Sequence, residues 1–188
     1  TGLPPITARP IDMQAIRNLA TPRHLVLIGL IVACALSRLL PHPWNFSPIE
    51  SVALFAGAVF ASRAAAVLVP LAAMLLSDLV LGFHFGMPVV YACMALIALA
   101  GGRLGAHAGP ARIALFGLSS AVFFFIVTNF ASWLVWGMYP LSFDGLLACY
   151  VAAIPFFHNQ LAGVAVYSTV LFGALALLRR RQPALATG

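Results

Sequence analysis

Residues 111–135 read ARIALFGLSSAVFFFIVTNFASWLV, a run in which Arg112 is the only charged side chain. A helix that crosses the hydrocarbon core of a bilayer needs about 20 consecutive, mostly apolar residues. This stretch therefore predicts a transmembrane helix. The rest of the chain has the same character, since 63% of its 188 residues are hydrophobic, 7% are charged and the mean hydropathy is +1.04. Such a composition is typical of a membrane protein with several spans.

Five further apolar stretches predict five more helices, so the expected fold class is all-α, a polytopic bundle of six transmembrane helices. The further stretches lie at residues 24–40, 48–60 (or from residue 44), 64–81 and 88–100, and the last ends at residue 178 after beginning between residues 144 and 154.

The ten basic residues are all arginine, and their positions predict how the helices cross the membrane. Cytoplasmic loops of membrane proteins carry an excess of Arg and Lys. The loops at residues 41–47, 82–87 and 136–143 carry none. Six helices with both termini cytoplasmic satisfy this bias at every crossing, whereas five or seven helices violate it. The arginines that flank the predicted helices on the cytoplasmic side are Arg17, Arg23, Arg63, Arg103, Arg112, Arg179, Arg180 and Arg181.

The ends divide the chain into three parts. Residues 1–22 are expected to form a tail with a short interfacial helix, residues 23–181 the six-helix transmembrane domain, and residues 182–188 a second tail. Two origins fit residues 1–12, a native tail or an expression scar before Met13. The sequence Ile31-Val-Ala-Cys34 resembles a lipoprotein cleavage box, but cleavage there would remove the first helix and spoil the even number of crossings.

Aromatic residues and histidines mark the three loops that lack arginine. These loops hold Trp44, Trp136, Tyr139, His42 and His84. Two interpretations stay open. The aromatic rings could form the belt that membrane proteins place at the lipid–water boundary, or they could line a ligand site that opens outward.

Two carboxyl groups fall inside apolar stretches, at Glu50 and Asp78. A charged side chain at the centre of a bilayer costs about 2.5–3.5 kcal/mol on insertion scales, so it usually faces a partner or a cavity. Arg38 lies near the outer end of its predicted helix, at a depth similar to Asp78. We therefore expect an ion pair of Arg38 with Asp78 or Glu50, and Asp78 could also form the floor or rim of an outward pocket.

The chain has three cysteines, so at least one thiol is free unless pairing is intermolecular. Cys93 lies about five residues into its predicted helix from the outer end, near Tyr91. Two roles are open for it. A buried cysteine is usually a small packing residue, but a thiolate that faces a pocket can bind a soft or borderline metal.

Small residues recur at four-residue spacing in the first helix, at Gly29, Ala33 and Ser37. Such a stripe lets another helix approach closely. The partner could be a helix of the same bundle or a second membrane protein.

Several function classes find no support in the sequence. It contains no HExxH, GxSxG or GxxxxGK[ST] motif, so zinc proteases, serine hydrolases and P-loop ATPases are disfavoured. If transport needs ATP, another protein must hydrolyse it. The net charge of +6 follows from membrane topology, and no basic face interleaved with aromatics suggests nucleic acid.

Three segments carry a resemblance to a known group of proteins. They are Arg38-Leu-Leu-Pro-His-Pro-Trp-Asn-Phe, Leu76-Ser-Asp-Leu-Val-Leu-Gly-Phe-His84 and Cys149-Tyr-Val-Ala-Ala-Ile-Pro-Phe-Phe157. Over roughly residues 25–178 the chain resembles small bacterial transport proteins similar to S-components, the substrate-binding subunits of energy-coupling-factor transporters. Within that group Cys93 looks like the cobalt-ligating cysteine of the BtuM family of solitary vitamin B12 transporters.

The resemblance implies a six-helix, S-component-like bundle in the bacterial inner membrane, with cobalamin as the ligand. It implies that the thiolate of Cys93 binds cobalt in place of the lower base and promotes removal of cyanide from cyanocobalamin. It also implies that the stripe of Gly29, Ala33 and Ser37 docks on a coupling subunit, which would act with ATPases, unless the protein works alone.

The other pocket residues follow from the predicted topology, because the loops after the first, third and fifth helices lie on one side. The apolar walls of this pocket would come from Trp44, Trp136, Tyr139 and Phe143, and the groups that meet the amide side chains of a corrin from Asn45, Asp78, His84 and Tyr91. Two other hypotheses stay open: an S-component for a different vitamin or small metabolite, and a structural membrane protein with no ligand. A membrane enzyme ranks last, since no catalytic constellation is recognisable.

Overall fold

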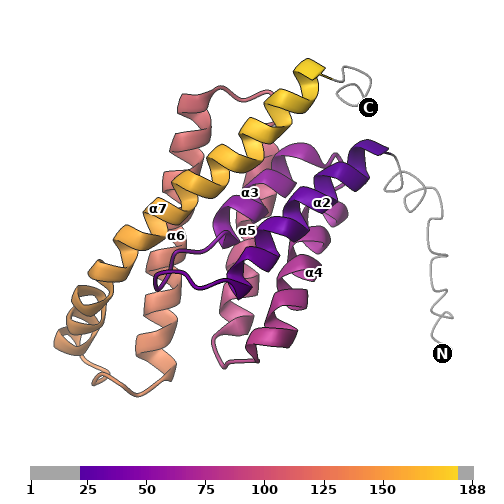
Figure 1. Ribbon diagram of the computed structural model, residues 1–188. Helices are drawn as coiled ribbons and strands as arrows, with labels where there is room; N and C mark the ends of the chain where they lie inside the picture. Colours follow the sequence, from indigo (N-terminus) through magenta and orange to yellow (C-terminus); the bar gives the residue numbers. More distant parts are fainter. Residues whose placement is uncertain (1–21, 182–188) are drawn as a thin grey trace, which may run out of the picture.

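The computed structural model describes residues 22–181. Within this range the chain forms six α-helices and one 3-10 turn, and no β-strand occurs there. Figure 1 shows the helices packed side by side, with α7 running along one flank of the bundle. The elements are α2 (Pro22–Leu36), η1 (Ser37–Leu39), α3 (Ile49–Val59), α4 (Arg63–Leu81), α5 (Met87–Leu104), α6 (Pro110–Val135) and α7 (Phe143–Arg181).

Five of these helices, all except α3, are long and apolar enough to cross a membrane. The chain is therefore an all-α membrane protein. Helix α3 has 11 residues, which rise about 16 Å and fall short of a hydrocarbon core of about 30 Å. The possible extension of this helix to residue 44 does not form, because residues 44–48 are a turn, irregular chain and a bend. The predicted interfacial helix at residues 13–20 lies outside the described residues.

The last helix is longer than predicted. Helix α7 has 39 residues and begins at Phe143, one residue before the predicted window. At about 1.5 Å per residue it measures about 58 Å, roughly twice the thickness of the hydrocarbon core. Pro155 lies inside it, and the orange part of the helix in Figure 1 turns away from the axis of the yellow part. A proline removes one helical hydrogen bond and allows such a kink.

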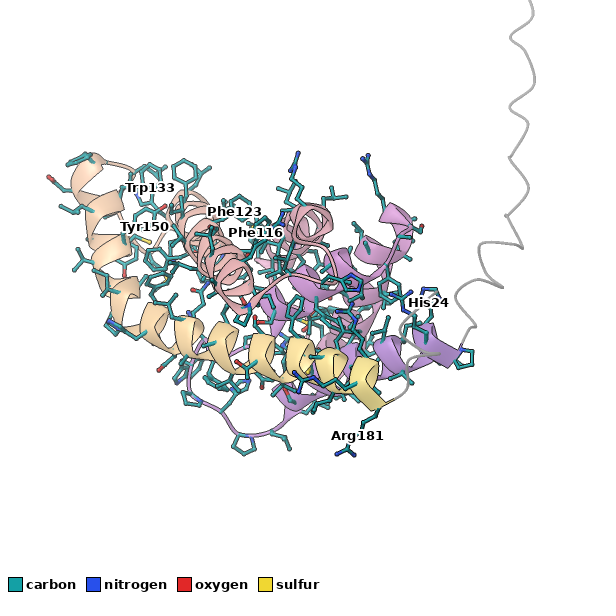
Figure 2. The ribbon with its side chains drawn as sticks, turned by 90° about the horizontal axis from the view of Figure 1, so that it is seen from above. His24, Phe116, Phe123, Trp133, Tyr150 and Arg181 are labelled. Atoms are coloured by element: carbon teal, nitrogen blue, oxygen red, sulfur yellow. The ribbon has the colours of Figure 1, made fainter. Side chains whose placement is uncertain are left out.

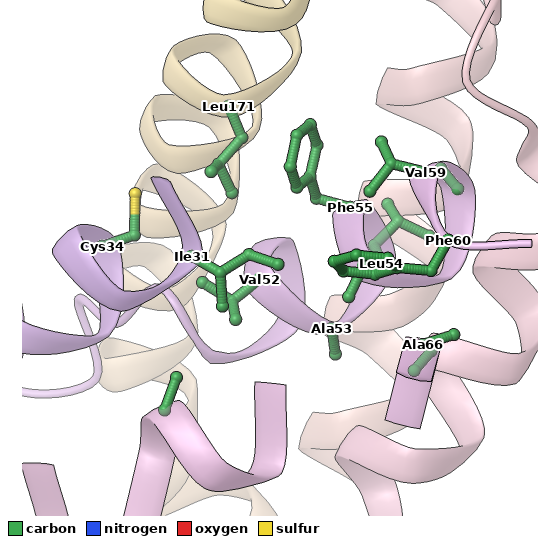
Figure 3. Close-up of a cluster of buried hydrophobic side chains, with 14 of the residues drawn as sticks. Ile31, Cys34, Val52, Ala53, Leu54, Phe55, Val59, Phe60, Ala66 and Leu171 are labelled. Atoms are coloured by element: carbon green, nitrogen blue, oxygen red, sulfur yellow. The ribbon is translucent and has the colours of Figure 1, made fainter. Parts of the chain in front are cut away.

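Helix α3 forms the centre of the bundle. Every one of its residues is buried, and it packs against α2, α4, α5, α6 and α7. Figure 3 shows Leu54, Phe55 and Val59 of α3 among side chains from the surrounding helices, such as Ile31 and Leu171. A helix that is apolar on all sides is typical of such a central position.

Glycine lets α3 and α5 cross at close range. A side chain at Gly57 of α3 would overlap the backbone carbonyl of Ala98, and a side chain at Gly101 of α5 would overlap the carbonyl of Leu54. The two backbones thus touch where both helices lack a Cβ atom. Small residues at such crossings are the usual way to bring membrane helices together.

The arginine-bearing ends of the helices gather at one end of the bundle. Arg112 donates a hydrogen bond to the carbonyl of Arg103, and Arg179 donates one to the carbonyl of Ala106. Arg23 lines the same small hollow as Arg179. The His24 ring stacks on Phe60, just before α4, with centroids 5.5 Å apart. These segments therefore lie together at one end of the bundle.

We predict that Gly101→Ala destabilises the protein, because the added methyl group would collide with the α3 backbone. Overpacking of this kind typically costs about 1–3 kcal/mol. Thermal unfolding in detergent should show a lower midpoint. Gly102→Ala is the matched control, since its Cβ would meet the nearest atom, the carbonyl oxygen of Gly57, at an ordinary 3.9 Å. Equal midpoints for the two variants would contradict the close crossing.

Candidate functional site

The first polar cluster inside the bundle is built around Asp78. The Oδ1 atom of Asp78 accepts a hydrogen bond from the Arg38 guanidinium at 2.6 Å, and Oδ2 accepts one from the Tyr91 hydroxyl at 2.6 Å. Arg38 also donates to the Ser77 hydroxyl at 2.7 Å. Of the two predicted ion pairs, Arg38 with Asp78 is the one that forms. The carboxylate is thus both neutralised and fixed in position.

This cluster lies at one depth. Arg38 follows Arg23, and Asp78 follows Arg63, by the same number of residues. This separation corresponds to a rise of about 22 Å along each helix. Tyr91 reaches the same level from α5, about 18 Å from Arg103. Because the hydrocarbon core is about 30 Å thick, the cluster lies in the half of the bundle that is remote from the arginine-rich end.

The second polar cluster joins three helices around Glu50. The Gln160 side-chain amide of α7 donates to the Glu50 carboxyl at 2.6 Å and to the Ala121 carbonyl of α6 at 3.1 Å. Glu50 is 1% exposed, and between residues 22 and 181 the only carboxylate in an ion pair is Asp78. Glu50 is therefore a buried carboxyl group held by a neutral amide rather than by a cation.

The start of α3 lacks a side-chain cap. Its N-cap residue is Pro48, and no side chain accepts a hydrogen bond there. The Ser47 hydroxyl, one residue earlier, is buried and has no hydrogen-bond partner. The Glu50 carboxyl in the first turn lies inside the bundle, where it bonds to Gln160.

Cys93 lies beside this second cluster. Its side chain is 1% exposed, and its thiol is close enough to the Glu50 carboxyl for an electrostatic interaction. All three cysteines are free and buried. No group of three His, Cys, Asp or Glu residues that could hold a metal ion occurs in the described part of the chain. The thiol could therefore be one ligand of a metal whose other ligands come from a bound molecule and not from the protein.

The structure divides the other predicted pocket residues among separate places. Asp78 and Tyr91 belong to the first polar cluster. His84 and Trp136 line a hollow of about 100 Å³ between α5 and α6. Trp44 and Asn45 lie in the α2–α3 connection, while Tyr139 and Phe143 precede and begin α7. Trp44 is 80% exposed. Of the eight residues, His84 and Trp136 line this hollow, and Asp78 and Tyr91 share the first polar cluster.

The hollow between α5 and α6 offers few hydrogen-bonding groups to a ligand. The Thr128 and Ser132 hydroxyls that line it donate their hydrogens to the carbonyls of Phe124 and Thr128, each at 2.8 Å. Their oxygen atoms can still accept hydrogen bonds from a ligand. Ligand pockets usually measure about 300–1,000 Å³, so this hollow suits only a small group.

Residues 40–48, which we call the strap, run from η1 to α3 and pack against α7. The Asn159 side chain donates a hydrogen bond to the Trp44 carbonyl at 3.0 Å, and the rings of Phe46 and Tyr167 lie 5.7 Å apart. A Cβ atom on Gly163 would lie 2.9 Å from the backbone nitrogen of Ser47. The strap thus depends on one face of α7, and it leads directly into the turn of α3 that carries Glu50.

The three residues of the predicted docking stripe, which begins on α2, do not share one environment. Gly29 and Ala33 are exposed, and a Cβ atom on Gly29 would meet nothing within 4 Å. Ser37 instead bonds to the Tyr167 hydroxyl at 2.7 Å and to the Cys34 carbonyl at 2.6 Å. The first two positions therefore form an open face, while the third belongs to the interior.

The sequence analysis missed Gly163 and Tyr167, which hold the strap. A signal was present, because Asn159, Gly163 and Tyr167 recur every four residues and so share one face of a helix. It also missed Ser77, which precedes Asp78 and adds a partner for Arg38.

We predict that Gly163→Ala displaces the strap and exposes Cys93, because the new methyl group would meet the Ser47 backbone. Alkylation of Cys93 by a maleimide, followed by mass spectrometry of peptides, should become at least severalfold faster. Cys34 serves as an internal reference. Gly173→Ala is the matched control on the same helix, since a Cβ there meets nothing within 4 Å. Equal Cys93 rates in both variants would contradict a covering role for the strap.

Comparison with known proteins gives a family but no described relative. No curated protein and no solved structure matches the chain. Residues 18–185 match a protein family that is described as a family of unknown function, DUF6580. Since the match covers most of the chain, this protein belongs to the DUF6580 family.

Proposed function

We propose that the chain is a multi-pass protein of the bacterial inner membrane, with six crossings and both termini in the cytoplasm. Five helices are long enough to cross alone. The sixth crossing would combine α3 with the strap, since an extended chain spans up to about 3.3 Å per residue and adds to the 16 Å of the helix. The arginine-rich end of the bundle would face the cytoplasm.

The proposed activity is uptake of cobalamin, with the Cys93 thiolate as a ligand of the cobalt. The observation that carries the proposal is a thiol buried inside the bundle, on the helix α5 that crosses α3, the helix of Glu50, at close range. Polar groups at this depth are costly, so they usually mark a substrate path or partner site. Cys93 lies about 15 Å from Arg103 along α5, near the bilayer midplane, where many transporters bind their substrates.

The chemistry of the thiol suits this substrate. A thiolate is a soft ligand for a transition metal, and a thiol must lose its proton before it binds. In the proposed exchange the sulfur of Cys93 donates an electron pair to cobalt and displaces the lower base. Cyanide leaves with the electron pair of the cobalt–carbon bond and takes up the thiol proton. The cobalt needs no change of oxidation state, so no external reductant enters this step.

The proposal requires the bundle to open. A corrin ring does not fit a hollow of about 100 Å³, and Cys93 is almost fully covered. The strap is the segment proposed to move, because its contacts with α7 are few and its Trp44 side chain already projects into the surroundings. Loops that close over a ligand commonly depend on such a small set of contacts.

A second candidate is favoured by the size of the hollow. Uptake of a small vitamin or metabolite would need no large opening, and His84, Trp136, Thr128 and Ser132 offer both apolar and polar contacts. In this case Cys93 would be a packing residue. Mass spectrometry of small molecules released from the purified protein separates the two candidates.

The proposed partner is an energy-coupling membrane subunit that docks on Gly29 and Ala33, with ATPases bound to it. The support is the open face at these two residues, where another helix could approach closely. Transport by the protein alone is the alternative, and uptake measured with and without a coupling module distinguishes them.

We predict that Cys93→Ala and Cys93→Ser abolish decyanation of cyanocobalamin and the change in its absorption spectrum on binding. Both variants remove the sulfur that would bind cobalt. Spectra of the purified protein with cyanocobalamin provide the measurement. Cys149→Ala is the matched control, because Cys149 is also free and buried and should leave both properties intact. Unchanged spectra in the Cys93 variants would refute the cobalt assignment.

We also predict the side of the membrane on which residue 181 lies. A reporter that works only in the cytoplasm should be active when it is fused after residue 181, and a reporter that works only outside should be inactive there. An even number of crossings places both ends on the same side, so a reporter fused before residue 22 should agree. Paired fusions to alkaline phosphatase, which is active outside, and to green fluorescent protein, which is fluorescent inside, make the measurement. Opposite results at the two ends would require five or seven crossings.

A further inference from the structure

The arginine-rich end of the bundle holds two cations that form no ion pair with a carboxylate of residues 22–181. Arg23 of α2 and Arg179 of α7 line one small hollow, and they are near enough to repel each other. The Nη1 atom of Arg179 donates to the Ala106 carbonyl. The Nε and Nη2 atoms of the same guanidinium are buried and have no hydrogen-bond partner.

Each acidic residue of the described chain either bonds to another side chain or lies far from Arg23 and Arg179. The sequence has four Asp and Glu residues, and Asp12 lies outside the described range. Asp78 pairs with Arg38, and Glu50 bonds to Gln160. Asp144 lies in the first turn of α7, at the opposite end of that helix from Arg179. Two close guanidinium groups with unused buried donors therefore call for an anion from outside the described residues.

We propose that Arg23 and Arg179 bind the phosphate of an anionic phospholipid in the leaflet at the arginine-rich end. Guanidinium groups bind phosphate oxygens through paired hydrogen bonds. The other residues of its wall are apolar, Val26, Leu27, Leu175 and Leu178, and such surroundings suit lipid chains that lie against the mouth of the hollow. Basic pockets between helices at the cytoplasmic boundary are a recurrent form of lipid site.

The size of the hollow narrows the class of ligand. Its volume of about 10 Å³ admits roughly one oxygen atom. A phosphate could insert one oxygen toward Arg179 while its remaining atoms stay at the membrane surface. The apolar residues around the two arginines favour a lipid phosphate over the phosphate of a soluble anion. The leaflet assignment rests on the proposed topology, but binding by the two arginines does not.

The test is native mass spectrometry of the purified full chain with phosphatidylglycerol or phosphatidylcholine of matched acyl chains. Wild type should retain phosphatidylglycerol in preference to phosphatidylcholine. Arg179→Gln should weaken phosphatidylglycerol binding at least about tenfold, as expected for loss of a charge-assisted hydrogen bond. Arg23→Gln provides a second variant with the same expected direction, in case the first does not fold.

Arg181→Gln is the matched control, because it removes the same charge two residues away. Arg181 is exposed, and Figure 2 shows it projecting away from the bundle. It should bind phosphatidylglycerol as wild type does. Equal losses in the Arg179 and Arg181 variants would indicate general surface charge and overturn the site. Equal binding of the two lipids would also overturn it.

Inorganic phosphate distinguishes a lipid headgroup from a soluble anion. Phosphate alone should leave the melting temperature unchanged, whereas phosphatidylglycerol should raise it. An equal rise with inorganic phosphate would overturn the lipid assignment. These measurements use no cobalamin, so their failure and a failure of the proposed uptake function can be told apart.

Discussion

The close crossing of α3 and α5 is the contact on which the rest of the structure depends. Because Gly57 and Gly101 lack side chains, the two backbones touch and α3 can lie at the centre of the bundle. A helix in this position is surrounded on all sides, so it needs neither a polar face nor the length of a full span. Because α3 begins only at Ile49, after the strap, its first turn, with Glu50, lies in the interior.

The two carboxyl groups of the interior each have a partner from another helical element. Arg38 of η1 neutralises Asp78 of α4, and Gln160 of α7 satisfies both Glu50 and a carbonyl of α6. An unsatisfied polar group in a membrane costs several kcal/mol, so these contacts also fix how the helices are rotated relative to one another. The interior thus combines a rigid set of hydrogen bonds with a strap that a few contacts hold in place.

The sequence predicted the helices from local properties, whereas its pocket residues stay a prediction. Apolar length and the positions of arginine are local properties, and the bilayer fixes their meaning, so the six apolar stretches of the sequence all became helices. The length of α7 was missed because residues 143–157 are apolar enough for a helix but lie beyond what a span requires. The pocket residues were chosen by topology alone. Their true neighbours depend on contacts such as Asn159 with Trp44, which are 115 residues apart, and no local pattern records them.

The two ends of the bundle differ in how their charges are neutralised, and this difference follows from their surroundings. In the half of the bundle remote from the arginine-rich end, Arg38 lies among apolar helices, and the chain itself supplies Asp78 as its counter-ion. At the arginine-rich end, the described chain places no carboxylate in an ion pair with Arg23 or Arg179. The cytoplasmic surface of a membrane is rich in anionic headgroups. Under the proposed topology a lipid headgroup would therefore play the part that Asp78 plays for Arg38, and it would satisfy the buried donors of Arg179.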